Sequence, residues 1–306
     1  MRALVTGATG FIGRRLLEHI DDPVVVTRDP QRAGRKLAGA EIHAWNPMSE
    51  PLPAAALRDV QAVFHLAGEP IAAGRWTAEK RRRLRESRTI GTANLVKGLA
   101  AVASRPSVLV STSAIGYYGS RGDEILTESS TPGSDFLAEV CVAWEAASAP
   151  ARELGVRVVN PRIGIVLGES GGALSKMLMP FKLGLGGRLG DGKQWMSWVS
   201  IDDLVGIMLM AAERGNLEGP INAVSPNPLT NEDFTRVLGR VLHRPTVLPA
   251  PAFGLRLLLG EFADVLLGSQ RVMPLAAERA GYTFKRPQLE QALRSIIEGE
   301  SAVGAH

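Results

Sequence analysis

A glycine-rich turn near the start of the chain has the spacing of a phosphate-binding loop. It reads Thr6-Gly7-Ala8-Thr9-Gly10-Phe11-Ile12-Gly13 and lies between a short apolar run and a stretch with helical spacing. Gly7 permits a tight turn, Gly10 lets the backbone approach a pyrophosphate, and Gly13 lets helix and strand pack closely. The first amides and the positive dipole end of such a helix favour an anion. We therefore expect this turn to bind a dinucleotide through these residues: Gly7, Thr9, Gly10, Phe11, Ile12 and Gly13.

The residues after the expected second strand indicate which dinucleotide binds. NAD-selective sites place an acid there, where it bonds the ribose 2′-hydroxyl. This chain has Arg28 followed by Asp29, and Arg32 lies four residues after Arg28. A guanidinium pairs well with a 2′-phosphate, which an acid would repel. We predict NADP as the cofactor, with Arg28 on the 2′-phosphate; the competing interpretation makes Asp29 the acid of an NAD site.

The elements that must position these groups alternate between strands and helices. The run Val24-Val25-Val26 is β-branched and continuous, which is typical of a strand buried on both faces. This rhythm predicts a parallel sheet with right-handed crossovers, and so a Rossmann-type doubly wound α/β fold. We expect strands at 3–6, 23–27, 42–45, 62–66, 107–113 and 156–160, and helices at 11–20, 77–103 and 136–154.

The alternation breaks after Arg162. A glycine-rich segment over 164–192 follows, with a short helix near 174–181; a strand over 195–200, a helix over 202–212 and a last sheet strand at 221–224 come next. The remainder reads as mostly helical and is interrupted by prolines. We expect a dinucleotide-binding domain over 1–162, to which 198–224 return. A smaller, mostly helical substrate-binding region would comprise 163–197 and 225–306.

Composition and charge exclude several classes of protein. A chain of 306 residues with 45% hydrophobic and 22% charged residues is globular. The net charge of +4 could suggest nucleic acid, but the densest basic run, 80–88, reads as the solvated face of a helix with Leu84 and Ile90 inward. Only 5% of residues are aromatic, so a stacking platform for single strands is not expected. We predict no nucleic-acid partner.

Other sequence features bear on the cellular compartment and on metal binding. No apolar run reaches the roughly 18 residues of a membrane-spanning helix, so no membrane partner is expected. Cys141 is the one cysteine, and the histidines show no metal-ligand spacing, so neither a disulfide framework nor a metal site is predicted. The first residues lack the features of a targeting signal, and we expect a cytoplasmic protein.

Several segments resemble the extended and atypical short-chain dehydrogenase/reductases, the NAD-dependent epimerase/dehydratase family. The resemblance implies that Leu66, Ala67, Gly68, Pro161 and Arg162 also contact the cofactor. Three further matches, HLAGEPI, FLAEVC and a C-terminal extension of unassigned function, resemble a branch called epimerase family proteins. The segments are TGATGFIG at 6–13, DVQAVFHLAG at 59–68, GTANL at 91–95, VSTSA at 110–114 with YYG at 117–119, PRIGIVLG at 161–168, WVSIDDL at 198–204, HLAGEPI at 65–71, FLAEVC at 136–141, RVMPL at 271–275 and AGYTF at 280–284.

The catalytic pattern of that family is incomplete here. The family carries Tyr-x-x-x-Lys on the helix after the fifth strand, where the lysine lowers the tyrosine pKa from about 10 so that the phenol exchanges a proton near neutral pH. In this sequence the slot falls at 136–141, and neither Tyr nor Lys occurs between Gly119 and Gly155. The usual proton relay is therefore absent.

Four side chains are candidates for the missing proton transfer: Ser113, Tyr117, Tyr118 and Glu139. The resemblance implies that Ser113, at a strand end, bonds the substrate oxygen. Glu139 would act as a general base if burial raised its pKa. No lysine neighbour is expected for either tyrosine, so an unshifted phenol would favour NADPH-dependent reduction by donating a proton. The structural alternatives are a backbone-bonded serine, a packing pair of tyrosines and a surface glutamate.

Two functions follow from these observations. The first is an NADP(H)-dependent oxidoreductase or epimerase whose small-molecule substrate is unknown, with sugar nucleotides and carbonyl compounds as candidates. The alternative is a catalytically silent NADP(H)-binding redox-sensor or regulatory protein. Relatives commonly pair the helices expected at 77–103 and 136–154 in a four-helix interface, so a homodimer is an expected assembly.

Overall fold

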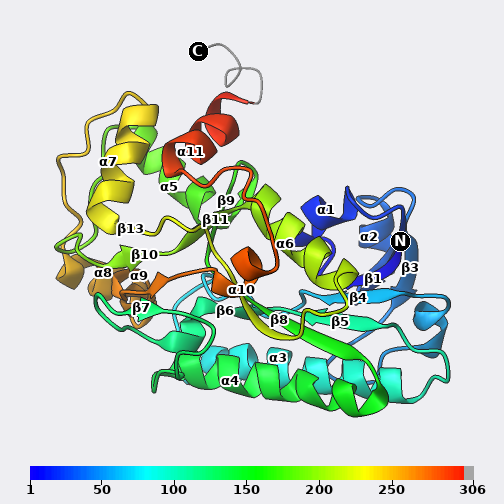
Figure 1. Cartoon of the computed structure of the whole chain (residues 1–306). Coiled ribbons are helices and arrows are strands. Elements are labelled where there is room, and N and C mark those ends of the chain that lie inside the picture. Colours follow the sequence, from blue (N-terminus) through cyan, green and yellow to red (C-terminus); the bar gives the residue numbers. More distant parts are fainter. Residues whose placement is uncertain (300–306) are drawn as a thin grey trace.

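The computed structural model describes residues 1–299 and shows a parallel sheet with helices on both faces (Figure 1). In these residues the sheet has eight strands in the order β12-β8-β5-β4-β1-β2-β3, with β6 also paired to β8. This arrangement confirms the predicted Rossmann-type doubly wound fold. The strands are β1 (Arg2–Thr6), β2 (Asp22–Thr27), β3 (Glu41–Ala44), β4 (Ala62–His65), β5 (Val108–Ser111), β6 (Ser113–Ala114), β8 (Arg157–Ile163) and β12 (Gly219–Ala223).

Alternate side chains of β1 enter the two layers of the core. Leu4 belongs to a buried cluster that includes Leu95 of α3, whereas Val5 belongs to a second cluster that includes Leu204 of α6. Figure 1 shows α3 and α4 on one face of the sheet and α1, α2 and α6 on the other. The helices of these layers are α1 (Phe11–Leu17), α2 (Pro30–Gly34), α3 (Ala78–Ala100), α4 (Phe136–Ser148) and α6 (Ile201–Glu213), with 3-10 helices η1 (Ala54–Leu57), η2 (Ile115–Tyr118) and η3 (Ala149–Leu154).

Apart from α6 and β12, the segments beyond β8 form small sheets and helices beside the main sheet, and β7 contributes to one of these sheets. β9 pairs with β11, β10 with β13, and β7 with β14. The single strand expected over 195–200 is two strands separated at Ser197, whose Oγ donates to Gln270 O and accepts from Val272 N. The elements are β7 (Ile125–Leu126), β9 (Ile165–Gly168), α5 (Gly172–Lys182), β10 (Trp195–Met196), β11 (Trp198–Ser200), β13 (Leu229–Thr230), α7 (Asn231–Val241), α8 (Ala252–Leu259), α9 (Phe262–Leu267), β14 (Arg271–Val272), α10 (Leu275–Arg279) and α11 (Leu289–Glu298).

The carboxylate of Asp203 ties the C-terminal segment to α6. It accepts hydrogen bonds from the Tyr282 hydroxyl and from the backbone amides of Lys285 and Arg286. Asp203 is buried, so these bonds replace the water that its charge would otherwise need. The C-terminal segment is thus a fixed part of the structure that surrounds the sheet edge.

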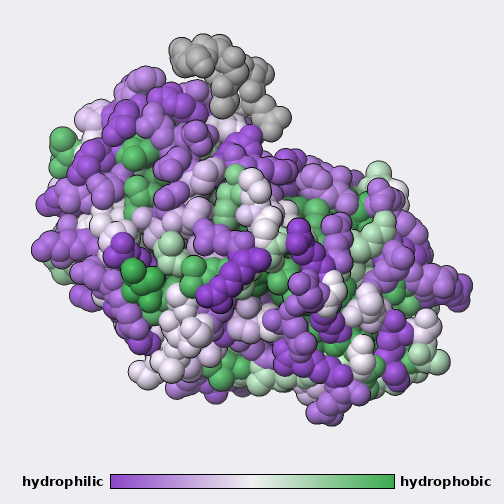
Figure 2. All heavy atoms as spheres, in the orientation of Figure 1, coloured by the Kyte–Doolittle hydropathy of each residue, from purple (hydrophilic) through white to green (hydrophobic). Residues whose placement is uncertain are grey.

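The outer surface is largely hydrophilic on the face seen in Figure 2, where apolar residues gather only in small groups. Over residues 1–299, no helix is both long and apolar enough to cross a membrane.

Candidate functional site

The glycine turn has the close backbone contacts that its sequence predicts. Gly7 has φ +70°, and a Cβ atom there would lie 3.0 Å from the amide nitrogen of Ala67. At Gly13 a Cβ atom would lie 2.5 Å from the carbonyl oxygen of Gly7, too close for any side chain. Gly10 is the N-cap of α1 and provides no side-chain cap. The first amides of α1 therefore remain available to an anion.

The other predicted residues of the turn are exposed or half-buried. Thr9 is exposed, and Ile12 packs half-buried against the apolar cluster on that face of the sheet. The Phe11 ring lies so close to Gly168 and Gly171 that a Cβ atom at either would come within 2.6 Å of it. In this structure Phe11 joins the turn to the segment between β9 and α5.

A buried chain of side chains fixes the backbone beside the turn. Thr6 Oγ1 accepts from the amides of Leu66 and Ala67, both at 3.1 Å, and lies 2.8 Å from His65 Nδ1. The Thr6 hydroxyl then donates to Nδ1, and the other ring nitrogen of His65 donates to Thr92 Oγ1 at 3.0 Å. Burial lowers the pKa of His65 to about 4, in agreement with this neutral ring. The sequence prediction missed Thr92.

Asp29 and Arg28 have different surroundings at the end of β2. Asp29 Oδ1 accepts from the amide of Arg32 and caps α2, so its carboxylate has a structural partner. Arg28 is exposed, and its charge helps to lower the pKa of Glu69, after the larger effect of the hydrogen bond from Lys80. Glu69 directly follows Gly68, so Arg28 lies near the loop that leaves β4. The geometry favours Arg28 over Asp29 as the group free to meet a ribose substituent.

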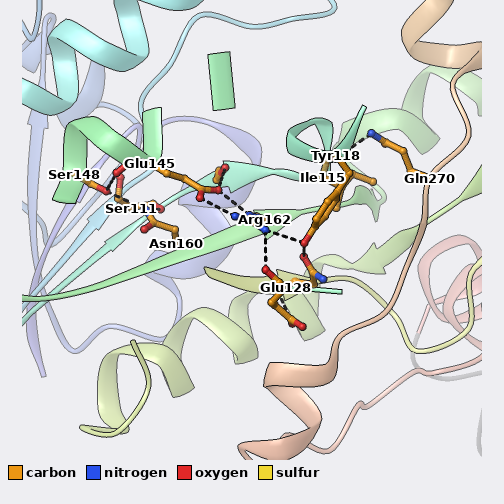
Figure 3. A network of polar contacts seen from close by, with 11 residues as sticks. Ser111, Ile115, Tyr118, Glu128, Glu145, Ser148, Asn160, Arg162 and Gln270 are labelled. Atoms are coloured by element: carbon orange, nitrogen blue, oxygen red, sulfur yellow. Dashed lines mark hydrogen bonds and ion pairs between the residues drawn. The ribbon is translucent and has the colours of Figure 1, made fainter. Parts of the chain in front are cut away.

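A polar network lies beneath the ends of β5, β6 and β8 (Figure 3). Ser113 Oγ donates to Glu145 Oε1 at 2.7 Å. Arg162 binds the same carboxylate at two points, with Nε to Oε1 at 2.8 Å and Nη2 to Oε2 at 2.9 Å. Although burial acts in the opposite direction, the bond to Glu145 raises the pKa of Arg162. The network therefore contains a permanent cation, a carboxylate and a hydroxyl in direct contact.

The two tyrosines have different places in this network. The Tyr118 hydroxyl donates to Asn222 Oδ1 at 2.6 Å and accepts from Arg162 Nη1 at 3.0 Å, and its side chain is fully buried. Burial raises the pKa of Tyr118 to about 12, so it stays protonated and structural. Tyr117 is half-buried, its hydroxyl has no protein hydrogen bond within residues 1–299, and its ring centroid lies 3.4 Å from the guanidinium carbon of Arg162. The cation beside both tyrosine rings is Arg162, an arginine in place of the lysine of the family's dyad.

Three residues that the sequence assigned to the site have contacts other than the expected ones. Glu139 is exposed and pairs with Arg85 of α3 at the surface, so the structure does not bring it to Ser113. Pro161 lies within β8 opposite Ile221, and the side-chain bonds of Arg162 go to the network rather than to the glycine turn. The carboxylate beside Ser113 is Glu145, which the sequence prediction missed.

The helical period of the sequence could have predicted which face of the helix carries Glu145. Glu145 follows Cys141 by four residues, and residues four apart share one face of a helix. Cys141 itself is buried, and burial raises the pKa of its thiol to about 11, so it behaves as a small apolar residue. Within the described residues, no group of three or more His, Cys, Asp or Glu side chains could hold a metal ion.

Comparison with known proteins identifies the families that this chain matches. Residues 3–223 match the NAD dependent epimerase/dehydratase family, and residues 250–296 match DUF1731, a domain of unknown function. An epimerase family protein of Mycobacterium bovis is 41% identical over 295 residues, which span 94% of this chain and 95% of that protein. The chloroplastic SDR39U1 homolog of Arabidopsis thaliana is 40% identical over 304 residues, 97% of this chain and 87% of its own.

A solved structure agrees with these sequence matches. The crystal structure of the human epimerase family protein SDR39U1 with NADPH is 32% identical and has a TM-score of 0.87 to this chain. The match covers 97% of this chain and 99% of the human one. The chain therefore belongs to the NAD dependent epimerase/dehydratase family.

Proposed function

We propose that this chain is an NADP(H)-dependent oxidoreductase or epimerase of the extended short-chain dehydrogenase/reductase type that works without a Tyr-x-x-x-Lys dyad. The observation that carries this proposal is the contact of Ser113 with the Glu145–Arg162 pair at the sheet edge where dinucleotide folds bind their ligands. That edge also carries the glycine turn. Its substrate would be a small molecule, with sugar nucleotides and carbonyl compounds as candidates.

The turn at the N-terminus of α1 fits a pyrophosphate. Close approach is provided by Gly7 and Gly13, where a Cβ atom would collide with backbone, and Gly10 leaves the helix start uncapped. The human relative was crystallised with NADPH, which supports the same cofactor here. Arg28 would hold the 2′-phosphate, because Asp29 is already engaged as the cap of α2.

The cofactor supplies hydride transfer when bound, and the chain must then manage a proton on the substrate oxygen. Glu145 accepts a hydrogen bond from Ser113, which fixes the direction of the hydroxyl proton and leaves the serine oxygen to accept a bond from a substrate hydroxyl. Tyr117 is the phenol whose hydroxyl lacks a protein partner among residues 1–299. We assign Ser113 to orient the substrate oxygen and Tyr117 to exchange the proton.

The proposal is tested by binding and turnover in sequence. NADPH affinity is measured by calorimetry, and libraries of carbonyl compounds and nucleotide sugars are then screened through the absorbance of NADPH and through ligand-induced shifts in Tm. Turnover of any substrate that falls on replacing Ser113 by Ala supports the enzyme. Tight NADPH binding with no turnover across both libraries favours the redox-sensor or regulatory function, and no NADPH binding overturns the proposal.

A further inference from the structure

Arg88 of α3 lies against the loop that leaves β4. A Cβ atom at Gly68 would lie 3.4 Å from the guanidinium carbon of Arg88 and 3.5 Å from its Nη2. Arg88 Nη1 donates to the carbonyl oxygens of Leu84 at 3.0 Å and Glu69 at 3.2 Å. The guanidinium carbon also lies 4.9 Å from the ring centroid of Trp144 on α4. Two carbonyls and an aromatic ring thus hold Arg88 in one orientation.

Several N–H donors of Arg88 remain without a protein hydrogen bond in residues 1–299. A guanidinium has five N–H donors, and both hydrogen bonds of Arg88 use Nη1, which leaves Nε and Nη2 unfilled. The carboxylate of Glu69 binds Lys80 Nζ at 2.7 Å instead. Burial lowers the pKa of Arg88 below its usual value, although the charge of Glu69 acts in the opposite direction. A held, partly dry cation with free donors is suited to bind an oxygen-rich ligand.

Both Arg88 and Ser113 influence the thiol of Cys141. The charge of Arg88 acts electrostatically on the Cys141 thiol, and the thiol also interacts with Ser113 and with the backbone of Ala114. The neighbouring helix α4 carries no lysine, since none occurs between residues 119 and 155. Arg88 therefore brings a positive charge to this place from α3.

The position of Arg88 along the sheet edge indicates which part of a dinucleotide it would meet. In a doubly wound fold the cofactor lies across the carboxyl ends of the strands, with the pyrophosphate at the first helix. Arg28 follows β2 on one side of the glycine turn, whereas Gly68 and Ser113 follow β4 and β5 on the other. The adenosine end of the cofactor would thus lie near Arg28, and its nicotinamide end would extend past Gly68 toward Ser113.

We propose that Arg88 binds the ribose hydroxyls on the nicotinamide side of NADP(H) through Nε and Nη2. This inference rests on the proposed function, because it requires that the chain binds the cofactor. It makes Arg88 a binding residue for the half of the cofactor that NADPH and NADH share, in contrast to Arg28.

Three ligands separate the two arginines by calorimetry. NADPH carries both the 2′-phosphate and the nicotinamide ribose, NADH lacks the phosphate, and adenosine 2′,5′-bisphosphate lacks the nicotinamide half. Arg88→Met keeps the apolar stem and should weaken NADPH and NADH alike, by roughly 10- to 100-fold, with the bisphosphate unchanged. Arg28→Ala should weaken NADPH and the bisphosphate but not NADH. Arg82→Met, an exposed change on the same helix, should alter none of the three.

The outcomes distinguish this inference from the proposed function. A parent protein that binds neither NADPH nor the bisphosphate contradicts the proposed function itself. A parent that binds NADPH, with unchanged affinity in Arg88→Met, overturns the role of Arg88 alone, and so does an equal loss for all three ligands. If Arg88→Met fails to fold, Arg88→Lys is measured in the same way. Its weaker binding of NADPH and NADH, with the bisphosphate unaffected, supports the inference, whereas unchanged binding of all three refutes it.

Discussion

Glu145 and Arg162 form a two-point ion pair that is almost entirely removed from water. The side chain of Arg162 is 3% exposed and that of Glu145 is 16% exposed. The carboxylate also accepts a hydrogen bond from Ser113, and the guanidinium also donates to the Tyr118 hydroxyl. The pair thus joins helix α4 to β8 and sets the position of both a serine and a tyrosine.

Loss of the Glu145 charge should destabilise the protein strongly. Glu145→Gln leaves the Arg162 cation buried without its counter-charge, which costs about 3–5 kcal/mol in such pairs. Glu139→Gln, on the same helix, breaks an exposed pair with Arg85 and should cost less than about 1 kcal/mol. Urea unfolding of both variants measures the difference, and equal losses would contradict the buried role of Glu145.

Cofactor selectivity should depend on Arg28. Arg28→Ala removes the guanidinium that we propose binds the 2′-phosphate. Such a contact contributes about 1.5–3 kcal/mol, so NADPH should bind roughly 10- to 100-fold more weakly. NADH lacks that phosphate and should bind as before. Calorimetric titration with both cofactors decides the matter, with Arg35→Ala, an exposed change at the C-cap of α2, as the control. Equal weakening of both cofactors would refute the assignment.

Local patterns were enough to predict the sheet and the turn. Runs such as Val24-Val25-Val26 and the glycine spacing over 6–13 depend on neighbours in sequence, and the structure contains both elements as expected. Strand β9 was missed inside the glycine-rich segment because it is held by β11, thirty or so residues away, rather than by its own composition. The expected strand over 195–200 was divided for a similar reason, since Ser197 bonds to residues near 270.

The candidate site shows the same limit more sharply. Ser113, Tyr117 and Tyr118 were predicted from one short segment, and the structure keeps them together. Arg162, which contacts this network from β8, was predicted to touch the cofactor instead. Its contact with the network could not be predicted, because no sequence pattern reveals that two distant segments face each other. Glu139 was predicted because it lies in the motif slot, and Glu145 was missed, although the helical period places Glu145 on the face toward the sheet.

Burial of His65 should make stability depend on pH below neutrality. Its pKa is about 4 in the folded state, whereas the unfolded imidazole has a pKa near 6.5, so the unfolded chain gains a proton first as the pH falls. The stabilising effect is complete above about pH 6.5 and is lost as the pH falls toward about 4. Between about pH 7 and about pH 5 the loss is about 2 kcal/mol. Urea midpoints of the parent and of His65→Asn test this, because the variant should lack that slope; an unchanged slope would show that His65 is protonated in the fold.

The buried Tyr118 and the half-buried Tyr282 should resist ionisation. Burial raises the pKa of Tyr118 to about 12 and also raises the pKa of Tyr282. The chain has three tyrosines, so Tyr117→Phe leaves only these two. Alkaline titration of that variant, followed by tyrosinate absorbance, should show little change until the pH exceeds about 11, whereas the same protein in urea should titrate near about pH 10. Ionisation near pH 10 in the folded variant would contradict the burial of their hydroxyls.

Ser113 and Tyr117 should carry the chemistry once a substrate is found. Hydride exchange at a carbon that bears oxygen requires a proton to leave or reach that oxygen, and a positioned acid or base contributes about 10²–10⁴-fold. Ser113→Ala and Tyr117→Phe should therefore lower kcat by factors in that range while NADPH affinity is kept. Tyr118→Phe removes bonds to Arg162 and Asn222 and should act on stability first.

Glu139→Gln is the matched control for this series, because its carboxylate pairs with Arg85 at the surface and should not influence the proton transfer. Its kcat should stay within about twofold of the parent, far below the change expected of a positioned acid or base. A large loss of kcat in Glu139→Gln with no loss in Tyr117→Phe would indicate that Glu139 is the general base. That result would refute the assignment of Tyr117. Activity near that of the parent in Ser113→Ala and Tyr117→Phe together would mean that the proton reaches the substrate from water or from a residue outside this network.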